Sequence, residues 1–143
     1  MNLVHRCSNG RLLLISRKIE AIQALAINDI SPSVVLMTAW TRESVRSEQL
    51  LIQKLLQLGC KYFVCAGRYA EDLHDFIDGL IEVGGEQSAS ITTTYHDDEP
   101  ADLVSNFFVN TTDMSNQGSD GLVAILNDDL PEDVLFKEEL LRS

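Results

Sequence analysis

The chain has 143 residues, of which 45% are hydrophobic, and its formal net charge is −11. A chain of this length and composition forms one domain around a single core, and we expect residues 1–143 to be that domain. It has no uncharged apolar run of about 18 residues that would cross a membrane. Its N-terminus also lacks the continuous apolar stretch of a secretory signal, so the expected location is the cytoplasm.

The charges are divided unevenly along the chain. Residues 1–68 hold nine Lys or Arg against four Asp or Glu, whereas residues 69–136 hold sixteen acidic residues and no Lys or Arg. Such an acidic half repels phosphate backbones, which argues against nucleic-acid binding. It favours a partner with a basic surface.

Several familiar sites are absent from the sequence. Cys7, Cys60 and Cys65 are odd in number and show no CxxC spacing, which indicates reduced thiols rather than disulfides or a zinc site. Neither a GxGxxG fingerprint nor a P-loop motif occurs. We therefore predict no cofactor.

The first turn signal is Asn9-Gly10, which separates two apolar runs and predicts a tight hairpin with one antiparallel strand at the start of the chain. Five short apolar runs rich in β-branched residues follow, and amphipathic stretches separate them. The predicted strands cover residues 11–16, 33–40, 61–66, 88–95 and 121–127. The predicted helices cover residues 17–27, 44–59, 69–85, 101–109 and 131–141.

Strands that alternate with helices predict a mainly parallel sheet covered on both faces. The expected fold class is α/β, a three-layer α/β/α sandwich with five strands, Rossmann-like or flavodoxin-like. The alternation resembles flavodoxin-like and receiver domains in architecture alone. Receiver domains carry an acidic pair after the first strand and a lysine after the fifth, where this chain has Arg17-Lys18 and Asp128-Asp129.

Two stretches share the pattern D-D-x-P-x-D-apolar, each between a predicted strand and a predicted helix. They begin at Asp97 and Asp128. Proline suits the first helical turn, and carboxylates there accept free N–H groups and oppose the positive end of the helix dipole. Helix capping thus explains most of the pattern.

The position of these loops also predicts a functional edge. In a parallel sheet the carboxyl ends of all strands lie along one edge, where ligands bind. With a strand order of 2-1-3-4-5, the loops after the third, fourth and fifth predicted strands are neighbours. The main hypothesis is a protein-binding or regulatory module, such as an immunity protein, an antitoxin or an accessory subunit, that binds a basic partner through Asp97, Asp98, Glu99, Asp128, Asp129, Trp40 and Arg68.

Two alternatives place chemistry in the same cleft. Cys65 precedes a predicted helix whose N-terminus, together with Arg68, would lower the pKa of its thiol, so it is a candidate nucleophile, with His96 as its base and Asp97 or Asp98 orienting the histidine. The acids at 97, 98, 128 and 129 are also candidate ligands for Mg²⁺, although no D-x-D or EF-hand spacing supports a metal site. Both alternatives require the cleft to bring these loops together.

Overall fold

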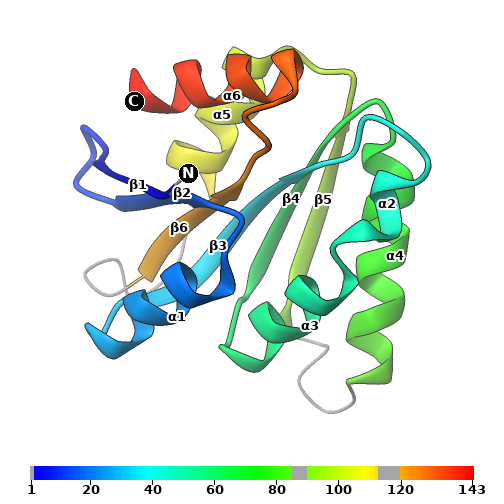
Figure 1. The fold of residues 1–143 in the computed structure, drawn as a ribbon, viewed down its shortest axis with the longest axis horizontal. Coiled ribbons are helices and arrows are strands. Elements are labelled where there is room, and N and C mark those ends of the chain that lie inside the picture. Colours follow the sequence, from blue (N-terminus) through cyan, green and yellow to red (C-terminus); the bar gives the residue numbers. More distant parts are fainter. Residues whose placement is uncertain (1, 85–89, 113–119) are drawn as a thin grey trace.

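The computed structural model describes residues 2–84, 90–112 and 120–143 (Figure 1). Strands and helices alternate after an N-terminal hairpin, so the chain has the predicted mixed α/β class. The strands are β1 (Asn2–Arg6), β2 (Leu12–Ser16), β3 (Ser31–Thr38), β4 (Tyr62–Gly67), β5 (Thr92–Asp97) and β6 (Asp120–Ile125). The helices are α1 (Ile19–Ile27), α2 (Ser44–Ser47), α3 (Gln49–Gln57), α4 (Ala70–Val83), α5 (Ala101–Asn106) with a π-helical turn η2 (Phe107–Thr111), and α6 (Pro131–Leu141).

The hairpin at Asn9-Gly10 forms as predicted. β1 pairs antiparallel with β2, and Gly10 has φ +91°, a left-handed conformation that glycine adopts without strain. This pair adds a sixth strand to the five expected from the sequence. The prediction of a five-stranded sheet is therefore corrected to six strands, all but β1 running parallel.

The strand order is β1-β2-β6-β3-β4-β5. The last strand, β6, lies between β2 and β3, whereas the expected order placed it beside β5. The expected flavodoxin-like order 2-1-3-4-5 is therefore wrong. β6 carries no charged residue from Gly121 to Ile125, and this stretch is completely buried, so the strand fits the centre of the sheet.

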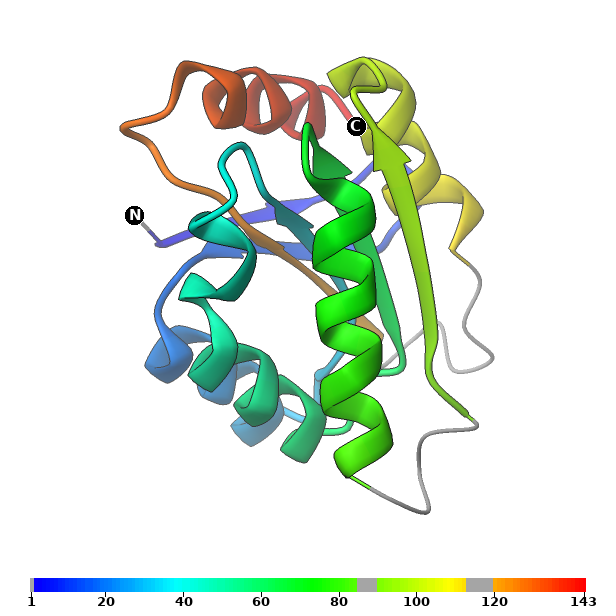
Figure 2. The ribbon, with the colours of Figure 1, turned by 90° about the vertical axis from the view of Figure 1, so that its right-hand side faces the viewer.

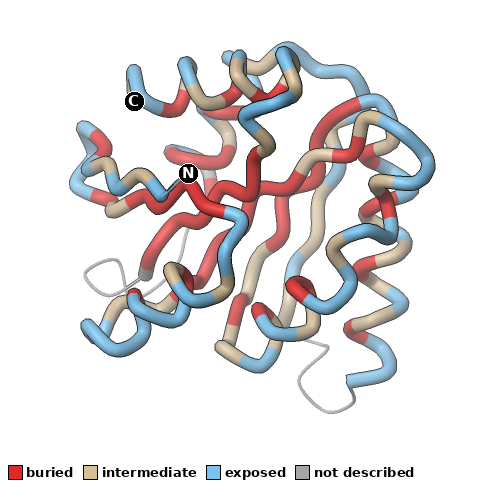
Figure 3. The backbone as a smooth tube through the Cα atoms, viewed as in Figure 1, coloured by how far each residue is buried: buried red, intermediate tan, exposed pale blue. Residues whose placement is uncertain are grey.

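The helices cover both faces of the sheet (Figures 1 and 2). Ile22, Ile52 and Ile77 from α1, α3 and α4 pack into one core on the first face. Val104 and Phe136 from α5 and α6 belong to a second core on the opposite face. Figure 3 shows the buried strands in the middle and exposed helix surfaces on the outside.

Helix ends follow local sequence signals. α3 is followed by Gly59 with φ +91°, and the N–H groups of Gly59 and Cys60 donate to the carbonyls of Leu56 and Leu55. β4 ends at Gly67, where φ is +97° and a Cβ would lie 2.6 Å from the Ala39 carbonyl oxygen. Only glycine fits this close approach between the ends of β3 and β4.

None of the helices in the described residues has the length and apolar character needed to cross a membrane.

Candidate functional site

The two acidic loops lie at the same edge of the sheet but not next to each other. Asp97 ends β5, the last strand at one side, and Asp98 follows it, whereas Asp128 and Asp129 follow β6. β3 and β4 lie between these strands, and three strand spacings amount to about 14 Å. The expectation that the four acids form one continuous rim or one Mg²⁺ site is therefore wrong.

Cys65 and His96 do not meet either. Cys65 is in register with Tyr95, and Ala66 is in register with His96, so the cysteine and the histidine extend from opposite faces of the sheet. Cys65 is fully buried in the core beneath α4, and burial raises the pKa of its thiol far above the usual value. A protonated, enclosed thiol lacks the thiolate character of a nucleophile.

His96 belongs to a structural cluster on the other face. Its ring lies 4.7 Å from the Phe107 ring, its Nδ1 lies 3.0 Å from Glu99 Oε2, and its Nε2 lies 3.2 Å from Thr94 Oγ1. Both ring nitrogens therefore have partners. Within the described parts of the chain, no three His, Cys, Asp or Glu side chains gather closely enough to hold a metal ion.

Trp40 is half-buried and anchored. Its Nε1–H donates to Asp133 Oδ1 at 2.7 Å, and the Thr38 hydroxyl donates to the same oxygen at 2.7 Å. The backbone N–H of Asn127 donates to Asp133 Oδ2 at 2.8 Å. Asp133 is itself 3% exposed and joins β3, the loop after β6 and α6. The indole N–H thus forms a structural hydrogen bond within the protein.

A small crevice lies beside this carboxylate. The helices that follow β2 and β3 pack on one face of the sheet, and the helix that follows β6 packs on the other. The crevice therefore lies at the topological switch point of the sheet. Its volume is about 140 Å³, and Arg17 and Glu48, paired at 3.0 Å, stand at its wall. Asp133 and this ion pair leave it small and polar.

Asp97 caps a helix, although not the one expected. Its Oδ1 accepts the backbone N–H of Glu71 at 3.0 Å, in the first turn of α4. Neither α5 nor α6 has a side-chain cap, so the predicted capping of these helices by the acids before them is wrong. Pro131 does occupy the first turn of α6 as predicted. The capping chemistry is right, but the helix that receives it is a spatial neighbour.

Exposed acids gather instead around β5. Tyr95 is 45% exposed on this strand, and the pKa of its phenol is raised, chiefly by the charge of Glu71 and a hydrogen bond with that side chain. Asp97 and Asp75 raise this pKa further. The phenol thus reports a negative potential on this surface. We call this surface the acidic edge, and it comprises Glu71, Asp75, Asp97, Asp98 and Glu99.

β5 is also the outermost strand of the sheet. It pairs with β4 alone among the described strands, so its other side presents backbone N–H and C=O groups (Figure 2). His74 on α4 packs its ring 5.0 Å from that of Tyr95. Arg68, proposed from the sequence as a contact residue, is exposed in the turn between β4 and α4.

Sequence reasoning missed Tyr95, Glu71 and Asp75 as members of this surface. The uniform acidity of residues 69–136 was the available signal, but it does not say which acids share a face. Asp133 was part of the recognised acidic pattern, yet its role as a buried acceptor depends on β3, nearly one hundred residues earlier in the chain. That role is readable only from the fold.

Searches among curated proteins and among solved structures return no match. The family described as Domain of unknown function (DUF7684) matches residues 16–142. This match spans every element from α1 to α6 and leaves out β1 and most of β2. The chain therefore belongs to the DUF7684 family.

Proposed function

We propose that this protein is a binding module that takes a basic, extended segment of a partner protein along β5. The observation that carries the proposal is a strand edge that no other described strand pairs with, combined with a border of carboxylates. An extended segment that adds to a sheet edge gains main-chain hydrogen bonds, and its side chains give specificity. Lysine or arginine side chains of such a segment would pair with the acidic edge.

Charge also explains why a second copy of this chain is a poor occupant of the same edge. Two copies meeting edge to edge would bring their acidic edges together, and like charges in register destabilise strand pairing. A basic partner is attracted from a distance and associates faster at low salt. The acidic edge thereby selects among the segments that a bare strand would accept.

The test uses a synthetic ten-residue peptide of alternating Lys and Thr as the probe. We expect it to bind the full chain at low salt and to lose at least about tenfold in affinity when Glu71, Asp97 and Glu99 are changed to Gln, Asn and Gln. The salt dependence should become shallower, because fewer charges pair. Titration calorimetry at two salt concentrations measures both effects.

The matched control changes Asp128 and Asp129 to Asn, with Glu138→Gln as the third substitution. It removes the same charge from places away from β5. Its affinity for the probe should stay within about twofold of the wild type. An equal loss in both triple variants would reduce the interaction to net charge and overturn the proposal. So would a probe methylated on alternate backbone nitrogens that binds as well as the unmethylated one.

A further inference from the structure

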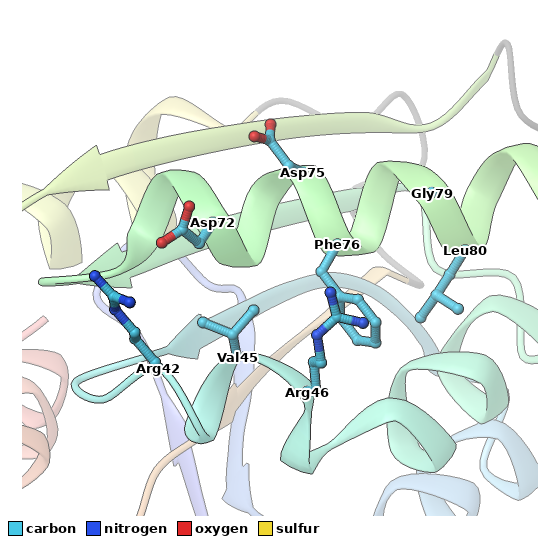
Figure 4. Close-up of a pocket in the computed structure, with 8 residues that line it drawn as sticks. All are labelled: Arg42, Val45, Arg46, Asp72, Asp75, Phe76, Gly79 and Leu80. Carbon is cyan, nitrogen blue, oxygen red and sulfur yellow. The ribbon is translucent and has the colours of Figure 1, made fainter.

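A groove on the other side of α4 has features that the acidic edge does not use. It runs between α2 and α4 and has a volume of about 740 Å³. Figure 4 shows Arg42 and Arg46 on the α2 side and Asp72, Phe76 and Gly79 on α4. Val45 and Leu80 complete an apolar floor. Asp75, which belongs to the acidic edge, also lines this groove, and the other lining residues lie outside that edge.

The two walls carry opposite charges that do not neutralise each other. Arg42 and Arg46 form no ion pair within 4.0 Å with a carboxylate of the described residues, although the chain has twice as many acids as bases. Arg46 instead places its guanidinium 5.2 Å from the centre of the Phe76 ring. The groove thus offers two guanidiniums on one wall and the carboxylates of Asp72 and Asp75 on the other.

Gly79 is a further feature of this groove, independent of its charges. It lies in the interior of α4, where glycine is less favourable than almost any other residue. A Cβ at this position would meet no atom within 4 Å, so packing inside the protein does not require glycine. Glycine without such a requirement leaves room for another molecule to approach the helix backbone closely.

The groove continues along α4 as an apolar hollow of about 510 Å³. The two share Leu80, and Leu56 from α3 and Ile81 line the second hollow. An open, elongated groove suits a peptide segment better than an enclosed small molecule.

We propose that this groove docks a partner segment in which an apolar side chain lies between an acidic and a basic one. The apolar side chain packs on Phe76 and Leu80 beside Gly79. Its acidic neighbour pairs with Arg42 and Arg46, and its basic neighbour pairs with Asp72. This site borders the acidic edge at Asp75, uses none of its other residues, and does not depend on the function proposed for β5.

The test is a selection of random displayed peptides on the immobilised full-length protein, with counter-selection on Gly79→Gln. Glu82→Gln is the matched control, because it puts the same side chain on an exposed position of α4 that lines neither hollow. The melting temperature of Gly79→Gln should equal that of the wild type or exceed it by about 2 °C, since glutamine favours the helix. Such a melting temperature would establish that the variant is folded.

Selected peptides should bind the wild type and Glu82→Gln equally and lose at least about tenfold in affinity on Gly79→Gln. They should carry an apolar residue flanked by Asp or Glu and by Lys or Arg. The same peptides should bind more weakly to the double variant Arg42→Gln/Arg46→Gln, in which the groove stays open. This variant tests the groove independently of any change at Gly79.

Three outcomes would overturn the proposal. The counter-selection leaves no peptide, or the peptides that remain lack an acidic residue and bind Arg42→Gln/Arg46→Gln as well as the wild type. A concentration-dependent self-association abolished by Gly79→Gln would assign the groove to a second copy. All-lysine peptides that weaken only when Glu71 and Asp97 are neutralised report on the acidic edge, so the two proposals fail separately.

Discussion

Asp133 is the residue on which three segments converge. Its two oxygens accept hydrogen bonds from Thr38, Trp40 and the backbone of Asn127. The carboxylate is 3% exposed, so its partners replace the water that it loses on folding. Its side chain thus fixes the position of α6 relative to the ends of β3 and β6.

Replacing Asp133 with Asn should lower the free energy of unfolding by about 2–4 kcal/mol. The amide has one acceptor oxygen, so its NH₂ group would face at least one donor that now binds the carboxylate. Urea denaturation measures the change. Asp128→Asn is the control, because this exposed carboxylate lies 3.8 Å from Lys137 and should change stability by less than about 1 kcal/mol. Equal effects of the two substitutions would contradict a special role for Asp133.

The start of α4 depends on a residue from another element. Asp97, at the end of β5, accepts the N–H of Glu71 in the first turn of α4. The carboxylate also opposes the positive end of the helix dipole. One side chain therefore both fixes α4 against the edge strand and contributes to the acidic edge.

Asp97→Ala should destabilise the protein by about 1 kcal/mol through loss of this cap, and Asp97→Asn should recover part of the loss because the amide oxygen still accepts. Thermal denaturation at constant salt measures both. Asp98→Asn is the neighbouring control. Asp98 has φ +52°, a left-handed conformation that asparagine also tolerates, so this change should leave the melting temperature unchanged. A larger effect at Asp98 would move the capping role to that residue.

At the scale of the whole molecule, repulsion outweighs attraction between charges. The formal net charge is −11, and the ion pairs formed by Lys or Arg in the described residues, such as Arg17–Glu48 and Arg142–Glu139, are few. The acids of the second half lie mostly on the surface, where they repel one another.

The melting temperature should therefore rise by a few degrees when NaCl is increased from about 20 to about 200 mM, because salt screens this repulsion. Differential scanning calorimetry measures the shift. The variant neutralised at Glu71, Asp97 and Glu99 should show a smaller rise. A melting temperature that falls with salt would mean that attractive pairs dominate.

Local patterns determined the elements of this protein. Hydrophobic periodicity, the Asn9-Gly10 turn, the glycine after α3 and the proline of α6 are properties of neighbouring residues, and they predicted most elements correctly. The helix predicted over 44–59 is divided into α2 and α3. The fourth predicted strand was the least accurate. Residues 88 and 89 of it lie outside the described residues, and β5 begins at Thr92 and ends at Asp97, because pairing with β4 sets its limits.

The sequence by itself determined an α/β chain with an acidic second half, since composition and short-range patterns are independent of how strands pair. Only the tertiary structure decided which loops are neighbours and which side chains share a face. The insertion of β6 between β2 and β3 separated the two acidic loops, and the register of β4 with β5 put Cys65 and His96 on opposite faces. Strand order and register arise from pairing between distant segments, so no single stretch of sequence determines them. A register shift of one residue would move every side chain of a strand to the opposite face of the sheet.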